Sequence, residues 1–168
     1  MQSVSPRITY AGLLFALAIT STMSNAATFA QPGTSFTTTG SIATAVKLLA
    51  WTPVPCSMAL SGQVSADGSS ATITGATFTP ANGTNVLCTL SGPLNLPWTL
   101  VPTSANTATL SGFSEKAAYD SCAAPSVLSM QWSAADNRFS IVSPHTMTAT
   151  CRITAFSFTP SPVLTINP

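Results

Sequence analysis

Residues 56–98 read CSMALSGQVSADGSSATITGATFTPANGTNVLCTLSGPLNLPW, and the pattern of this stretch recurs along the rest of the chain. Two cysteines bracket three short runs in which apolar and polar residues alternate, and Gly, Pro, Asn and Asp separate the runs. Alternation with a period of two is typical of a strand that has one buried face. The stretch therefore predicts antiparallel strands that are joined by tight turns.

The first two runs predict a β-hairpin. The apolar residues of the first run share one face of a strand: Cys56, Met58, Leu60 and Val64. Asp67-Gly68 follows, and this pair favours a tight turn because Gly adopts positive φ without steric cost. In the return run over residues 71–78 the apolar phase changes by one residue. This change predicts a β-bulge near Gly75.

The third run predicts another strand, with Val86, Cys88 and Leu90 on one face. Cys88 then points inward as Cys56 does, so the two could meet across a small core. The chain has four cysteines, which allow three disulfide pairings: Cys56, Cys88, Cys122 and Cys151. We favour Cys56–Cys88 with Cys122–Cys151, because each pair brackets a segment that resembles a hairpin. With one His and no closely spaced cysteines, no metal site is predicted.

The first residues predict export. An apolar run, ITYAGLLFALAI, follows Arg7, and Ser24-Asn25-Ala26 places small residues at the −3 and −1 positions of a signal-peptidase site. We predict a signal peptide over residues 1–26, with cleavage after Ala26, or after Ala27 as the alternative. The run is shorter than the ~20 residues that span a bilayer, so no integral membrane segment is expected in the mature protein. Residues 27–168 are then a single secreted domain, extracellular or alternatively periplasmic or cell-surface, in which disulfides persist.

The rest of the mature chain continues the alternating pattern. Residues 27–39 predict a turn and a Thr-rich strand, or alternatively a mobile N-terminal arm over residues 27–40. Residues 115–125 (EKAAYDSCAAP) predict a long loop or a single helical turn. Further alternating runs cover residues 127–133 and 147–155. The sequence predicts an all-β protein, an antiparallel β-sandwich or flattened barrel of roughly nine or ten short strands stapled by two disulfides.

Composition excludes some partners. Charged residues make up 5% of the chain, against roughly 25% in ordinary soluble domains. Beyond residue 26 the basic residues equal the acidic ones in number: Lys47, Lys116, Arg138 and Arg152 against Asp67, Glu115, Asp120 and Asp136. Nucleic acids and anionic membranes attract proteins through clustered Lys and Arg. Neither partner is expected for four scattered cations.

A search for catalytic residues finds no motif. The chain has no GxSxG or HExxH sequence, and His145 lies beside Pro144 in an expected exposed turn. The carboxyl groups of Glu115, Asp120 and Asp136 could meet in space, but scattered carboxylates are more typical of solvated charges. We therefore predict no catalytic residue, no cofactor and no enzymatic activity.

Two tryptophans are candidates for ligand contact. Trp51 and Trp98 each stand beside proline-rich extended chain, where an exposed aromatic ring could stack on a sugar or contact an alkyl chain. The alternative is that both rings belong to the core, because large aromatic side chains gain much from burial.

Three segments, PGTSFTTTG, PCSMALSGQVSADGSSATITGATFTP and NVLCTLSGPLNLPWTL, resemble the secreted bacterial proteins called protein activator of alkane oxidation (PraB-like). The resemblance covers roughly residues 32–113 and rests on the cysteine placement, on Leu96-Pro97-Trp98 and on the Thr-rich hairpin. Beyond Phe113 it is looser, chiefly Cys122, Trp132 and Cys151. The resemblance implies an exported, non-enzymatic protein that assists growth on hydrocarbons, by dispersing them or by acting in the extracellular matrix, and it supplies no active-site residue.

Two functions follow as hypotheses. The first is a secreted accessory protein that promotes alkane use by associating with a hydrocarbon surface or with the cell surface. The second is a structural subunit of an extracellular fibre or biofilm matrix that forms by self-association. Sparse charge leaves few residues that block pairing at strand edges, and an arm over residues 27–40 could add a strand to a neighbour.

Overall fold

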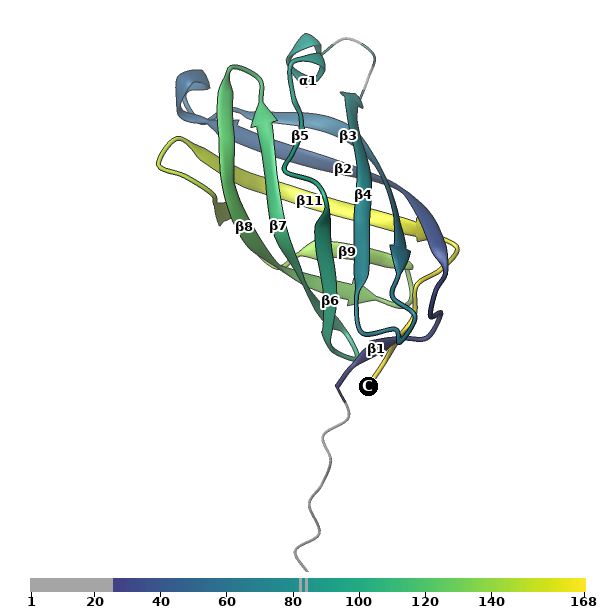
Figure 1. Cartoon of the computed structure of the whole chain (residues 1–168). Helices are drawn as coiled ribbons and strands as arrows, with labels where there is room; N and C mark the ends of the chain where they lie inside the picture. Colours follow the sequence, from purple (N-terminus) through teal and green to yellow (C-terminus); the bar gives the residue numbers. More distant parts are fainter. Residues whose placement is uncertain (1–25, 82, 84) are drawn as a thin grey trace, which may run out of the picture.

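Eight antiparallel strands form a closed barrel in the computed structural model, which describes residues 26–81, 83 and 85–168 (Figure 1). Each strand pairs with the next along the chain, and the last one pairs with both the first and the seventh. The barrel strands are β2 (Ser35–Val46), β3 (Pro53–Val64), β4 (Ala71–Pro80), β6 (Trp98–Ser104), β7 (Thr107–Ala117), β8 (Asp120–Ser133), β9 (Arg138–Ile141) and β11 (Cys151–Ser161). The prediction of an all-β fold with two disulfides is confirmed, and of the two predicted architectures the barrel is the observed one.

Short elements lie at the two ends of the barrel. At one end β1 (Thr28–Phe29) pairs with β12 (Ile166–Asn167), close to the C-terminus. At the other end, which we call the α1 end, lie the 3₁₀ helix η1 (Lys47–Leu49), the helix α1 (Val86–Thr89) and the turn between β7 and β8. Two more short strands line the wall: β5 (Gly92–Leu94) pairs with β7, and β10 (His145–Thr146) pairs with β11.

Aromatic side chains fill the interior. Alternate residues of each strand point inward, and the largest fully buried side chains include Trp98, Phe113, Phe139, Phe156 and Phe158. The ring centroids of Trp98 and Phe113 lie 4.6 Å apart, and those of Phe113 and Phe156 lie 5.3 Å apart. Tightly packed rings of this size leave the barrel a core rather than a channel.

The hairpin predicted from residues 56–78 is confirmed. Cys56, Met58, Leu60 and Val64 are all buried on one face of β3. Gly68 has a φ of 74° in the turn. The register between β3 and β4 shifts where Ser61 faces Gly75 and the next residue, Gly62, faces Ile73, so Thr74 is the extra residue of the expected bulge.

The strand predicted around residues 86–90 is wrong, because residues 86–89 form the helix α1. The Asn85 side chain accepts a hydrogen bond from the backbone N–H of Leu87 at 3.1 Å, which caps the first turn. Cys88 still points inward and is fully buried. Alternation over so few residues fits a helical turn as well as a strand, and here the cap favours the helix.

Residues 115–125 were also predicted wrongly. They are not a loop but the ends of β7 and β8, with Ala117 facing Asp120 across a two-residue turn. Ala118 has a φ of 50° in this turn. Tight hairpin turns are usually marked by Gly, Asn or Asp at such positions. An alanine there gives no sequence signal, so the hairpin was missed.

The alternative of a mobile arm over residues 27–40 is not what the structure shows. Phe29 of β1 is only 1% exposed. Residues 35–40 form the first half of β2 and pair with β3 on one side, and residues 37–40 also pair with β11 on the other. Residues 35–40 are therefore part of the barrel wall, and residues 28–29 pair with β12 at one end of the barrel. Of the predicted signal peptide, residues 1–25 lie outside the described part of the chain, and cleavage after Ala26 stays a prediction.

Each disulfide bridges an interruption in the barrel wall. β9 ends at Ile141, and beyond it Cys122 of β8 bonds to Cys151 at the start of β11. Among the described strands β4 pairs with β6 only over residues 71–73, and α1 and β5 lie beside its remaining half. There Cys88 of α1 bonds to Cys56 of β3. The structure thus has the cysteine pairing that the sequence favoured.

Gly40 allows β2 and β11 to approach closely. A Cβ atom built on Gly40 would lie 2.2 Å from the Ser157 carbonyl oxygen and 2.8 Å from the Phe158 Cα atom. Neither backbone atom can move without disturbing the ladder between the two strands. We therefore expect Gly40→Ala to lower the free energy of unfolding by roughly 1–3 kcal/mol, measured by urea denaturation.

Gly92→Ala is the matched control for this substitution. A Cβ atom at Gly92 meets nothing within 4 Å. The control should change the stability by less than about 0.5 kcal/mol. Equal stability of the two variants would show that the strands can separate at Gly40 without cost.

Candidate functional site

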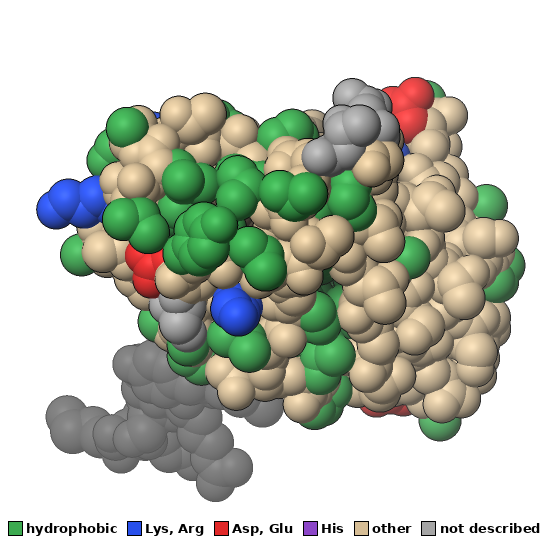
Figure 2. Space-filling model, turned by 90° about the horizontal axis from the view of Figure 1, so that it is seen from above, with side chains coloured by type: hydrophobic (Ala, Val, Ile, Leu, Met, Phe, Trp, Pro, Cys, Tyr) green, Lys and Arg blue, Asp and Glu red, His purple; other side chains and the backbone are tan. Residues whose placement is uncertain are grey.

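The α1 end of the barrel carries an exposed apolar patch. Leu48 on η1, Val86 on α1 and Tyr119 in the turn between β7 and β8 are 70%, 69% and 65% exposed. Figure 2, which looks onto this end, shows hydrophobic side chains gathered together on part of the surface with few charged groups among them. We call Leu48, Val86 and Tyr119 the apolar rim. Exposed hydrophobic side chains that cluster mark a surface that contacts another apolar surface.

A sharp reversal of the chain follows η1 at this end of the barrel. Ala50 and Trp51 have φ values of 51° and 62°, so the chain reverses sharply after η1 and enters β3. The Trp51 N–H donates to the Val46 carbonyl oxygen at 3.1 Å, which fixes the turn. The Arg152 guanidinium lies over the Trp51 ring, 4.8 Å from its centroid. One face of this half-buried ring is therefore covered by a cation.

The two tryptophans proposed as ligand contacts differ in their surroundings. Trp98 is fully buried, and its indole N–H donates to the Leu94 carbonyl oxygen at 3.0 Å. The prediction that Trp98 contacts a ligand is therefore wrong, because this side chain packs in the core. Trp51 lies at the α1 end and stays partly accessible.

A groove runs between η1 and α1. Its volume is about 360 Å³, and its walls are Leu49, Thr52, Pro53, Val54, Asn85 and Leu87. Leu49 and Leu87 also pack against the buried core. The Ser91 hydroxyl donates to the Leu87 carbonyl oxygen at 2.9 Å and accepts from the Ala118 N–H at 2.8 Å, which ties α1 to the turn between β7 and β8.

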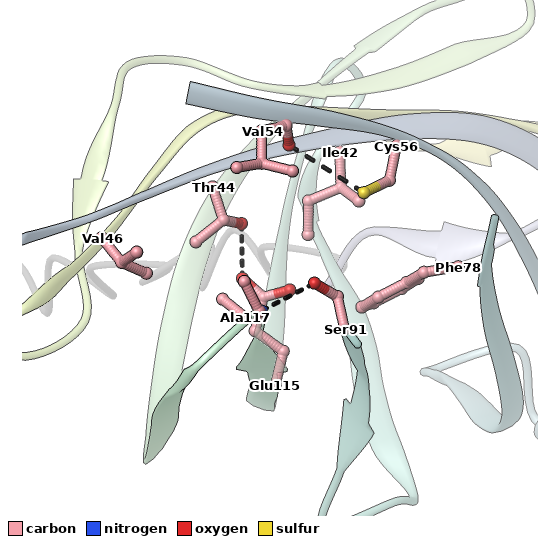
Figure 3. A pocket seen from close by; sticks show the side chains of 10 residues that line it. Ile42, Thr44, Val46, Val54, Cys56, Phe78, Ser91, Glu115 and Ala117 are labelled. Carbon is pink, nitrogen blue, oxygen red and sulfur yellow. Dashed lines mark hydrogen bonds between the residues drawn. The ribbon is translucent and has the colours of Figure 1, made fainter. Parts of the chain in front are cut away.

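A buried carboxyl group lies just inside this end. Glu115 of β7 is 1% exposed, and its Oε1 atom accepts a hydrogen bond of 2.5 Å from the Thr44 hydroxyl of β2 (Figure 3). The cavity beside it holds about 10 Å³, room for one water molecule at most. Its other walls are largely apolar and include Ile42, Val54 and Phe78.

Burial shifts the ionisation of this group. Removal from water raises the pKa of Glu115 from 4.5 to about 7, and the hydrogen bond from Thr44 offsets part of the rise. Among the described residues that line the cavity, no other side chain carries a titrating group, because Cys56 is disulfide-bonded. At neutral pH the carboxyl group is therefore protonated for much of the time.

The expectation that Glu115 is a solvated charge is wrong, because this side chain is buried. A signal for its burial was present, because Phe113, Glu115 and Ala117 alternate and share one face of a strand. The three are buried, and so is Ser114, whereas Lys116 is exposed. The helical-turn or loop prediction for residues 115–125 hid this pattern.

The remaining candidate acids and the histidine do not converge. Asp136 lies in the turn after β8 and accepts a hydrogen bond from the Ser133 hydroxyl, at the opposite end of that strand from Asp120. His145 belongs to β10 rather than to an exposed turn. Within residues 26–81, 83 and 85–168, no three His, Cys, Asp or Glu side chains are grouped as metal ligands would be. None of the helices in this part of the chain is long and apolar enough to cross a membrane.

The whole chain matches one protein family. A family model described as "Alkane oxidation protein activator PraA/PraB-like" matches residues 1–168. The chain belongs to this family. The resemblance noted over roughly residues 32–113 is thus confirmed and extends over the whole chain. The comparisons with curated proteins and with solved structures gave no match.

The family description and the disulfides each support one further statement. The family description names an activator of alkane oxidation rather than a catalyst. The two disulfides of this PraA/PraB-like protein indicate an oxidising compartment, extracellular or periplasmic.

Proposed function

We propose that this PraA/PraB-like protein is a secreted, non-enzymatic accessory protein that promotes alkane use by binding to hydrocarbon surfaces through its apolar rim. The observation that carries the proposal is the exposure of Leu48, Val86 and Tyr119 at one end of the barrel, where hydrophobic side chains gather on the surface (Figure 2). Transfer of each such side chain from water into oil is favourable by about 1.5–3 kcal/mol when it is fully buried. A protein that adsorbs in this way lowers the interfacial tension and stabilises small oil droplets.

The filled interior supports contact on the outside of the barrel. Ligand sites for small molecules usually have volumes of about 300–1,000 Å³. The cavity at Glu115 holds about 10 Å³, and aromatic and aliphatic side chains are packed in the core. A long alkane therefore meets this protein at its surface.

The alternative of a fibre or matrix subunit has weaker structural motives than the sequence suggested. Among the described strands the sheet order closes, because β11 pairs with both β2 and β9, although residues 74–80 of β4 pair with no strand on the side away from β3. Residues 35–40 belong to β2 and residues 28–29 pair with β12, so extending them to a neighbour would break these pairings. Self-association by strand exchange would first require the barrel to open.

Replacing the apolar rim tests the proposal. We expect the triple variant Leu48→Ser, Val86→Ser and Tyr119→Ser to adsorb to a hexadecane–water interface at least about tenfold more weakly than the unsubstituted protein. The interfacial tension of a hexadecane drop in purified oxidised protein measures this adsorption, and emulsion lifetime gives a second reading.

The chain offers a matched control for the triple variant. Val127, Val142 and Val163 are 57%, 63% and 49% exposed and lie outside η1, α1 and the turn between β7 and β8. The variant with these three valines changed to serine should adsorb as the unsubstituted protein does. Equal losses in the two triple variants would mean that general surface hydrophobicity, and not the rim, causes adsorption. No adsorption by the unsubstituted protein would remove the proposed function.

A further inference from the structure

One side chain separates the groove from the cavity. Val54 of β3 lines both the groove between η1 and α1 and the cavity at Glu115, and it is 7% exposed. The groove side is largely apolar, with Leu49, Pro53 and Leu87. On the inner side stand the Glu115 carboxyl group and the hydroxyl groups of Thr44 and Ser91. The groove and the cavity are thus two separate spaces that have Val54 as a common wall.

The polar groups of the cavity favour one class of ligand. In its protonated state a carboxyl group both donates and accepts a hydrogen bond, as a hydroxyl group does. The described residues that line the cavity include no Lys or Arg that could hold the carboxylate of a fatty acid, and an ionised Glu115 would repel such a carboxylate. Among the described residues only Thr44 hydrogen-bonds to this carboxyl group, through Oε1, so the other oxygen is available to a ligand.

The sizes also agree. The groove of about 360 Å³ lies in the range of ligand sites, whereas the cavity of about 10 Å³ admits a group the size of a water molecule. A hydroxyl group has this size, and a methyl-terminated chain has no polar atom to satisfy there. Rotation of the Val54 side chain is the movement that would join the two spaces.

We propose that the α1 end binds a primary aliphatic alcohol, with the alkyl chain in the groove between η1 and α1 and the terminal hydroxyl group hydrogen-bonded to Glu115. The inference rests on the proposed association with hydrocarbon, because it assigns to the same end of the barrel a molecule that combines an alkyl chain with one polar group. It adds a specific site to a surface that otherwise adsorbs to oil without discrimination.

Chemical shift mapping on the oxidised ¹⁵N-labelled protein tests the site, with 1-octanol and octane as probes at pH 6. We expect 1-octanol to shift the backbone amides of Thr44, Glu115 and Ala118 together with those of Leu49 and Leu87. Octane should shift only the amides of Leu49 and Leu87. Shifts that stay in the groove with both probes, or no shift with 1-octanol, would overturn the inference.

Two substitutions at one position separate recognition from packing. Glu115→Leu should weaken 1-octanol binding by about tenfold, the loss of one hydrogen bond to a buried group, and should remove the preference over octane. Glu115→Gln retains a donor and an acceptor and should bind 1-octanol as the unsubstituted protein does. Lys116→Leu, on the exposed face of the same strand, is the control that should change nothing. Unchanged 1-octanol affinity in Glu115→Leu would contradict the role given to the carboxyl group.

The two proposals can fail separately. Glu115 is buried, so Glu115→Leu should leave adsorption to hexadecane unchanged. The serine variant of the apolar rim should still show the amide shifts with 1-octanol, because Leu48, Val86 and Tyr119 do not line the groove. If the serine variant loses adsorption but keeps the amide shifts, the rim binds oil independently of the alcohol site. If Glu115→Leu loses the preference for 1-octanol but keeps adsorption, the alcohol site acts independently of the rim.

Discussion

Replacing both Cys122 and Cys151 by serine is expected to lower the free energy of unfolding by about 4 kcal/mol. The bond closes a loop between residues that are 29 positions apart, and this closure restricts the unfolded chain. In the folded state the same bond joins β8 to β11 where β9 no longer lies between them. Urea denaturation of the oxidised protein and of the double variant measures the difference directly.

The second disulfide provides the comparison. Cys56 and Cys88 are 32 positions apart, so the chain-entropy contribution of this bond is nearly the same. Its removal should also increase amide hydrogen exchange in α1, because α1 is held against β3 by this bond. A loss below about 1 kcal/mol in either double variant would show that the barrel wall holds together at that interruption without the covalent link.

Raising the pH from 5 to 8 is expected to destabilise the fold by roughly 2–3 kcal/mol through Glu115. Its pKa is about 7 in the folded protein, because burial disfavours the charged form, against 4.5 for an exposed glutamate. Between these values the folded state holds a proton that the unfolded state has released, so the free energy of unfolding falls as the pH rises. Below pH 4.5 this contribution is complete, and above about pH 7 it is lost.

Glu115→Gln should abolish this pH dependence and make the protein more stable than the unsubstituted one at pH 8. The melting temperature measured at intervals between pH 5 and 8 checks the effect. Asp136→Asn, which changes an exposed carboxyl group, serves as the control. Hydrogen bonds from Ser65 and Ser69 lower the pKa of Asp67 to about 2, so its titration lies below this range. A Glu115→Gln variant with the original pH profile would place the titrating group elsewhere.

The local sequence pattern predicts where most strands lie, but it does not predict how the strands are arranged in the sheet. The β3–β4 hairpin and its bulge followed from alternation and from Asp67-Gly68, because both depend on residues close together in the chain. Closure into a barrel depends on β11 pairing with β2 and β9, and the first of these contacts joins residues more than one hundred positions apart. Alternation is the same in a sandwich and in a barrel, so the sequence left both open.

The candidate site was harder to predict because it combines residues from turns. Leu48, Val86 and Tyr119 lie in three segments that are far apart in the sequence, and only the fold places these segments at the same end of the barrel. Glu115 could have been found from its alternation with Phe113 and Ala117. It was missed because the charged, Ala-rich segment that follows looks like a loop.

The pairing of β1 with β12 has a practical consequence for orientation. Both strands lie at the end of the barrel opposite η1 and α1, close to the C-terminus (Figure 1). A tether attached after Pro168 would therefore hold the molecule by the end that faces away from the groove and the apolar rim. Beads or sensor chips coated in this way would present every copy with the same end toward the solution, so that one immobilised layer could report oil adsorption and alcohol binding alike.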